Sequence, residues 1–198
     1  HDLANCQRKD GKSQATNCKG GALTVASIFS TQELNRWRVV LQMETQKPLM
    51  DYIKVCELLP HRPPLLLVDR VQSINFETLE IHAIKCVTGG ESYLAGHFPG
   101  QPIVPGVYLV EGLAQTAAAM CFANFERQGE AVEKKCMLTG LDEVKFRRPV
   151  VPGDVIHYYA KYERHRGPFV WFTGMAKIDG EVAVEAKFSA ILARAPKV

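Results

Sequence analysis

A histidine and a glutamate that could exchange protons with one substrate flank an expected helix start. His97 lies in residues 96–106, a loop whose backbone is restricted by three prolines. Glu111 follows inside an apolar run, where an ionised carboxylate is costly unless it has a partner. Histidine commonly acts as a general base, and a glutamate in an apolar site can act as a general acid. The two residues therefore predict acid–base chemistry.

Each of these residues also has a structural interpretation. A lone histidine is more often a hydrogen-bonding residue of the fold, and a lone helical glutamate more often faces solvent. The helix start between them favours a functional site, because the N–H groups of a first turn have no partner inside the helix. The N–H of Gly106 is one of these groups, and it could stabilise negative charge developing on a carbonyl oxygen.

The elements expected around this site are one buried helix and a set of antiparallel strands. Residues 107–125 are apolar on almost every side, so this helix must be surrounded by protein. Residues 155–162, 169–178 and 182–192 are strand-like, and Asp179-Gly180 between the last two is a strong hairpin signal. The simplest arrangement is an α+β domain in which an antiparallel sheet curls around the long central helix.

The elements before this helix are shorter. Residues 50–59 predict a helix that Pro60 ends, residues 65–68 a buried strand, and residues 79–83 a half-exposed strand. Residues 1–42 are mostly polar and irregular, so we expect an N-terminal extension followed by one domain at 43–198. Within residues 31–43 an amphipathic pattern predicts a further helix. A targeting peptide is the alternative interpretation of the extension.

Composition excludes several classes of function. The 198 residues contain 24 Lys plus Arg against 21 Asp plus Glu, so net charge gives no reason to expect a nucleic-acid partner. No apolar run reaches the length of roughly 18 to 20 residues that a membrane span needs. The six cysteines are scattered without zinc-ligand spacing, which favours reduced thiols in the cytoplasm.

Several sequence blocks together resemble the (3R)-hydroxyacyl-acyl carrier protein dehydratases of type II fatty acid synthesis. The resemblance covers roughly residues 50–194 in the family's order and with its spacing between His97 and Glu111. The matching blocks are Leu58-Leu59-Pro60-His61-Arg62, Leu66-Leu67-Val68-Asp69-Arg70-Val71, Gly96-His97-Phe98-Pro99-Gly100, Pro105-Gly106-Val107 with Glu111-Gly112-Leu113-Ala114-Gln115, and Phe146-Arg147-Arg148-Pro149-Val150-Val151-Pro152-Gly153-Asp154.

The resemblance implies a hotdog fold and a cofactor-free, metal-free hydro-lyase of fatty acid biosynthesis. His97 would remove the proton beside the thioester carbonyl, and Glu111 would protonate the departing hydroxyl in a syn-type elimination that gives the trans-2-enoyl product. The Gly106 N–H would polarise the carbonyl. Gln115 would hold the Glu111 carboxyl group, with plain core packing as its alternative. The family forms homodimers, with the acyl tunnel at the interface and His97 and Glu111 from different subunits. Some members are trimers of such dimers.

The resemblance also implies an acyl carrier protein as partner, delivering the chain on its phosphopantetheine arm. Lys145, Arg147 and Arg148 are the candidate docking residues, and a solvated strand edge is the alternative. The tunnel candidates are Phe98, Tyr108 and Met137. Met137 stands where many members have a gating tyrosine, Tyr108 where leucine is common, and Pro63 where an aromatic residue is usual, so chain-length preference stays open.

Two other functions fit the same residues. The hotdog fold also occurs in acyl thioesterases, which would use Glu111 to activate water. A catalytically silent acyl-binding module is the third interpretation, although the presence of both His97 and Glu111 argues against it. Aspartate is typical at the position of Glu111 in the related dehydratases that also isomerise the double bond, so isomerisation is not expected.

Overall fold

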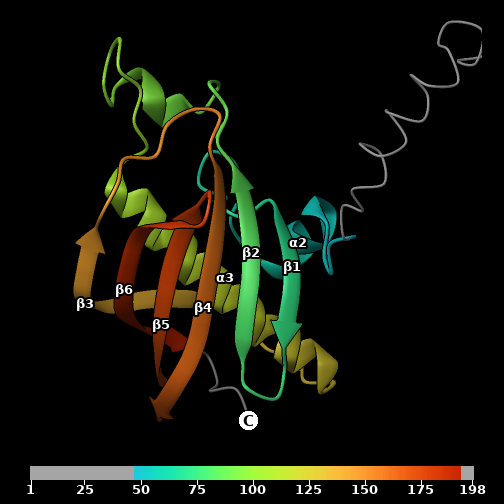
Figure 1. Ribbon diagram of the computed structural model, residues 1–198. Coiled ribbons are helices and arrows are strands. Elements are labelled where there is room, and N and C mark those ends of the chain that lie inside the picture. Colours follow the sequence, from blue (N-terminus) through green and yellow to red (C-terminus); the bar gives the residue numbers. More distant parts are fainter. Residues whose placement is uncertain (1–46, 193–198) are drawn as a thin grey trace, which may run out of the picture. The chain divides into compact units, whose positions relative to one another are not determined.

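A six-stranded antiparallel sheet and one long helix make up most of the structure, a computed structural model that describes residues 47–192 (Figure 1). The expected extension at 1–42 and the expected helix at 31–43 lie outside the described residues. The sheet order is β1-β2-β4-β5-β6-β3, so β1 and β3 are the two edges. The strands are β1 (Arg70–Asn75), β2 (Glu80–Cys86), β3 (Cys136–Phe146), β4 (Val155–Arg166), β5 (Phe169–Ile178) and β6 (Glu181–Leu192).

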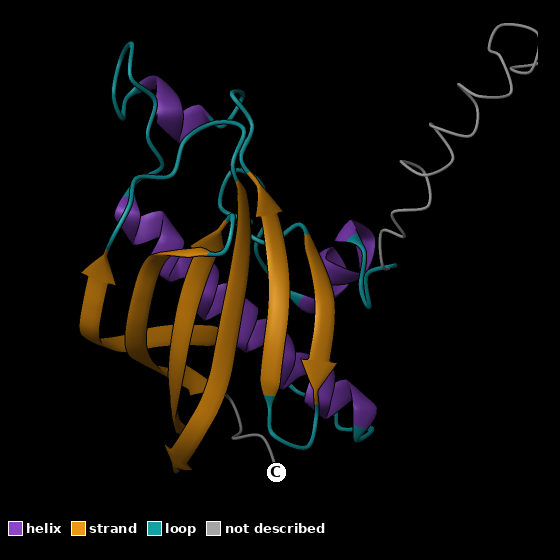
Figure 2. Ribbon diagram, viewed as in Figure 1, coloured by secondary structure: helices purple, strands orange, loops and turns teal. Residues whose placement is uncertain are grey.

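The long helix α3 (Gly106–Arg127) lies across the inner face of the sheet, which curls around it (Figure 2). This confirms the expected α+β arrangement. Pro105 occupies the N-cap position, and nearly every residue from Leu109 to Phe125 is buried. By length and composition α3 could span a bilayer, but 78% of its most apolar stretch is buried inside the protein, as in the core helix of a globular domain.

The hairpin between β5 and β6 forms where the sequence predicted it. Asp179 and Gly180 both have positive φ, 51° and 84°, as the expected two-residue turn requires. Burial then alternates along most of β6, because successive side chains point to opposite faces of the sheet. The expected strand at 79–83 is present as β2, and the expected helix at 50–59 is present as α2 (Tyr52–Leu58), capped by the side chain of Asp51.

The expected strand at 65–68 is absent. Leu66, Leu67 and Val68 are buried as predicted, but they run as irregular chain between α2 and β1. The Leu67 N–H bonds the side chain of Gln115 on α3 instead of a neighbouring strand. This stretch therefore packs on the helix, close to Glu111. A short 3₁₀ helix, η2 (Ser92–Ala95), precedes the loop that carries His97.

Candidate active site

The loop between η2 and α3 fixes both the position and the tautomer of His97. Both main-chain polar groups of His97 are hydrogen-bonded. Its N–H donates to Leu94 O at 3.3 Å, and its carbonyl oxygen accepts from the Ile103 N–H at 2.8 Å. Its Nδ1 lies 2.9 Å from the carbonyl oxygen of Ile103. A carbonyl oxygen can only accept, so Nδ1 carries the hydrogen of the neutral ring. Nε2 is then left with a free lone pair, as a general base requires.

His97 and Gly106 line one pocket of about 500 Å³. The remaining lining residues are Ile103, Val104, Val107, Leu109, Phe146, Arg147, Arg148, Pro149 and Val150. Gly106 starts α3, so its N–H belongs to the first turn, where backbone donors have no partner within the helix. The ring of Phe146 packs directly on Gly106, and a Cβ added there would lie 2.7 Å from its Cε1 atom. The ring thus occupies the space that a Cβ would fill, and the absence of a side chain at Gly106 allows this close contact.

Glu111 is not among the residues that line this pocket within the described chain. It lies on the partly exposed side of α3, one turn after Val107, which is 68% exposed. Its side chain is 37% exposed, so the expected burial of this carboxylate in an apolar environment is wrong for the single chain. The cause is that α3 is covered all round only from Gly112 onward, whereas one side of its first turns, at Val107 and Glu111, is left uncovered.

Gln115 holds the Glu111 carboxyl group in place through hydrogen bonds that fix the orientation of its side-chain amide. The amide oxygen of Gln115 accepts from the Leu67 N–H at 2.9 Å. Its NH₂ group therefore points the other way, and it donates to Leu65 O at 2.7 Å and to Glu111 Oε1 at 2.9 Å. The imidazole Nε2 of His61 lies 3.6 Å from the same Oε1 atom. Glu111 Oε1 thus accepts one hydrogen bond, from Gln115, and has the ring of His61 close by.

The three tunnel candidates differ in their surroundings. Phe98 is 53% exposed and stacks on the His97 ring, with ring centroids 4.1 Å apart. Met137, at the start of edge strand β3, is 62% exposed. Tyr108 is half-buried and packs edge-on against Tyr93 with ring centroids 4.7 Å apart.

The three candidate docking residues are each paired with acidic side chains. Arg147 hydrogen-bonds Glu185, and Lys145 Nζ lies 3.7 Å from the same carboxylate. Arg148 contacts Asp154 at 3.8 Å and Glu181 at 3.5 Å, and it is the least exposed of the three. The net positive charge of this cluster is therefore smaller than the sequence suggests.

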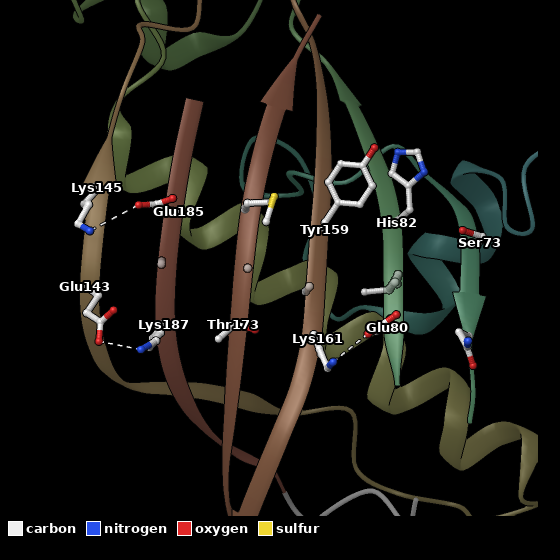
Figure 3. A pocket seen from close by; sticks show the side chains of 16 residues that line it. Ser73, Glu80, His82, Glu143, Lys145, Tyr159, Lys161, Thr173, Glu185 and Lys187 are labelled. Atoms are coloured by element: carbon white, nitrogen blue, oxygen red, sulfur yellow. Dashed lines mark hydrogen bonds and ion pairs between the residues drawn. The ribbon is translucent and has the colours of Figure 1, made fainter. Parts of the chain in front are cut away.

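A second depression of about 590 Å³ lies on the outer face of the sheet, away from α3 (Figure 3). Its rim carries three ion pairs between neighbouring strands, Lys145–Glu185, Lys187–Glu143 and Lys161–Glu80. None of the predicted catalytic residues lines it. Among residues 47–192, no group of three or more His, Cys, Asp or Glu side chains is arranged to hold a metal ion.

Comparison with known proteins decides the family. Residues 59–187 match the FabA-like domain family. The chain belongs to this FabA-like family. Among its relatives, the 3-hydroxyacyl-(acyl-carrier-protein) dehydratase FabZ of Methylobacterium nodulans is 46% identical over 148 residues, which is 75% of this chain and 92% of the relative. The enzyme of the same name from Anaeromyxobacter sp. (strain K) is 44% identical over 149 residues, which is 75% of this chain and 94% of the relative.

A solved structure supports the fold of this FabA-like chain. The dehydratase heterocomplex ApeI:P from Xenorhabdus doucetiae has a chain that superposes with a TM-score of 0.62 at 21% identity. The match covers 70% of this chain and 90% of that one. The fold is therefore the α+β hotdog fold that the resemblance implied.

Two residues near the FabA-like site were not singled out from the sequence. His61 and Phe146 both lie in blocks that carry the family resemblance, but neither has a local spacing that points to Glu111 or Gly106. Their positions depend on contacts between distant segments. His61 approaches α3 from the irregular chain after α2, and Phe146 reaches it from the end of β3.

Proposed function

We propose that this protein dehydrates (3R)-3-hydroxyacyl-acyl carrier protein to the trans-2-enoyl product in fatty acid elongation. The observation that carries the proposal is the fixed tautomer of His97 beside the start of α3, in a chain 46% identical to a dehydratase of this name. A base with a free Nε2 and an adjacent backbone N–H are what removal of a proton next to a thioester carbonyl requires.

In the proposed reaction His97 acts as the base and Glu111 as the acid. His97 Nε2 takes the proton from the carbon beside the carbonyl, and the Gly106 N–H stabilises the negative charge that develops on the carbonyl oxygen. The electron pair forms the new carbon–carbon double bond and expels the hydroxyl group. Glu111 gives that hydroxyl its proton, so water leaves. The cycle then closes when His97 loses its extra proton and Glu111 regains one from solvent.

A homodimer is the proposed working unit. His97 and Glu111 do not share a pocket in one chain, so we place His97 of one subunit opposite Glu111 of the other. Edge strand β3 supports this proposal because it exposes the apolar side chains of Met137, Leu141 and Phe146. An exposed apolar edge strand tends to pair with another chain, and a second subunit would cover it. In the proposed dimer, the exposed carboxyl group of Glu111 becomes covered by the second subunit.

The proposed partner is an acyl carrier protein, and the proposed compartment is the cytoplasm, as expected for fatty acid synthesis by separate enzymes. The relatives named above are called acyl-carrier-protein dehydratases, which supports this choice of carrier. The pocket that contains His97 is also lined by Arg147 and Arg148, so a carrier that docks there would meet basic side chains near the catalytic loop.

Product analysis tests the proposal. The purified protein is incubated with 3-hydroxyacyl thioesters of several chain lengths, on a carrier protein and on pantetheine, and enoyl product and free thiol are quantified together. We expect enoyl thioester to accumulate without release of thiol. Free thiol as the main product would indicate a thioesterase, and tight binding without either product would indicate an acyl-binding module.

A further inference from the structure

His61 contacts the Glu111 carboxyl group from a segment distant in sequence. It lies in the irregular chain between α2 and β1, and its Nε2 atom is 3.6 Å from Glu111 Oε1. This separation is slightly longer than a hydrogen bond. Catalytic hydrogen bonds are often long in the absence of substrate and shorten in the substrate complex. The contact is therefore compatible with a working hydrogen bond.

The surroundings of the two ring nitrogens indicate which tautomer His61 adopts. Its Nδ1 atom is buried and has no hydrogen-bond partner among residues 47–192. Nδ1 therefore stays unpaired in either neutral tautomer, so the two differ at Nε2. With its hydrogen on Nδ1, the ring would turn the Nε2 lone pair toward the oxygen of a carboxyl group, whereas a hydrogen on Nε2 gives that oxygen a donor. That hydrogen then points to Glu111.

The other titratable groups near the His61–Glu111 contact do not take up the hydrogen that His61 directs to Glu111. Burial and, to a lesser extent, the charge of Glu111 raise the pKa of the Cys136 thiol to about 12. Burial also raises the pKa of Tyr158, so both groups stay protonated at neutral pH. The guanidinium of Arg62 is engaged by the main-chain oxygens of Leu59 and His61.

We propose that His61 is a positioning residue that donates its Nε2–H to Glu111 Oε1 and thereby selects Oε2 as the oxygen that protonates the leaving hydroxyl. Gln115 donates to the same Oε1 atom at 2.9 Å. With two donors directed at it, Oε1 is held as an acceptor, so the proton of the neutral carboxyl group resides on Oε2. This inference rests on the proposed dehydration.

Without the His61 donor, the proton of Glu111 should be confined less strictly to Oε2, while substrate binding should be unaffected. In His61→Phe, which keeps a ring of similar size, we expect kcat to fall roughly tenfold, which corresponds to about 1.4 kcal/mol. KM should change less than about twofold. His61→Gln, which supplies an amide donor, should recover most of kcat.

The matched control is His165→Phe, which removes a histidine near the far end of β4 whose ring bonds Tyr162. It should have wild-type kcat and KM. The proposal is wrong if His61→Phe also behaves like wild type, or if His61→Gln is as slow as His61→Phe. Failure of the proposed function itself would appear differently, as absence of enoyl product from wild-type protein.

A second measurement tests the contact without relying on turnover. Long-range ¹H–¹⁵N spectra of the imidazoles in wild-type protein, with His61→Gln used to assign the signal, report which nitrogen carries hydrogen. We expect the hydrogen of the His61 ring on Nε2 and a lone pair on Nδ1. Hydrogen on Nδ1 would overturn the proposal.

Discussion

The position of Glu111 depends most directly on one buried amide. Gln115 is 1% exposed and joins the irregular chain at Leu65 and Leu67 to the carboxyl group one turn earlier on α3. In Gln115→Leu the buried Leu67 N–H loses its acceptor, which costs about 1–3 kcal/mol. We expect the free energy of unfolding to fall by that amount and kcat to fall as well, because Glu111 loses its stronger donor.

Urea denaturation and steady-state turnover measure the two effects. Gln72→Leu is the matched control, because the side-chain oxygen of Gln72 is buried without a partner among the described residues. That change should leave stability unchanged or raise it. Equal stability of Gln115→Leu and the wild type would show that the network around Leu67 contributes nothing to the fold.

The sequence predicts this network only in part. Gln115 follows Glu111 by one helical turn, so contact between their side chains is expected from helix geometry alone. His61 and Leu67 reach the same place through irregular chain, whose path no periodicity predicts. Phe146 is similar, since its contact with Gly106 depends on where β3 meets the helix.

At the level of elements, α3 approaches the sheet closely at Gly112. A Cβ added there would lie 2.3 Å from the hydroxyl oxygen of Tyr158 on β4, a side chain that is 1% exposed. Alanine is favoured over glycine in a helix by about 1 kcal/mol. Overpacking typically costs 1–3 kcal/mol, and here both the helix backbone and the tyrosine are confined. We therefore expect Gly112→Ala to destabilise the protein, by up to about 2 kcal/mol.

Thermal or urea unfolding of Gly112→Ala measures this effect. Gly89→Ala is its control, because a Cβ at Gly89 has nothing within 4 Å. The control should unfold like the wild type. If Gly112→Ala were more stable than the wild type, helix propensity would outweigh the clash, and α3 would have to sit farther from β4 than described.

The elements that sequence predicted best are those with a strong local signal. The helix at Gly106–Arg127 and the Asp179-Gly180 hairpin both formed as expected. A run that is apolar on all sides must be buried as a core helix, and Asp-Gly strongly favours a two-residue turn that needs positive φ. β3 was not predicted as a strand at 136–146. As an edge strand it is mostly exposed, and its burial does not alternate with period two, so its sequence lacks the usual strand signal.

At the level of the whole molecule, docking of a carrier protein is the property most sensitive to surface charge. Lys145 and Arg147 share Glu185, and solvent screens exposed ion pairs of this kind, so they contribute little to stability. Their reversal to glutamate should therefore spare the fold. We expect KM for carrier-bound substrate to rise several-fold, as rising salt should also cause in the wild type. Arg148 is left unchanged because it also contacts Asp154 and Glu181.

Kinetics on two substrates separate docking from catalysis. A short pantetheine thioester needs the catalytic residues but not the surface, so its turnover should be unchanged in Lys145→Glu/Arg147→Glu. The control variant Lys135→Glu/Lys161→Glu has the same change of net charge away from the His97 pocket. Equal loss on both substrates would mean that the two cations support the site itself, and unchanged KM on both would place docking elsewhere.

The central claim is that His97 and Glu111 act as base and acid on one hydroxyacyl thioester. Its most direct test is kcat for His97→Ala, for Glu111→Gln and for the double variant, with folding and dimer content verified in each. Each single change should lower kcat at least ~10²-fold, and the double variant should lose little more, because groups that act together are not additive. Near wild-type turnover in either correctly folded single variant would contradict the account.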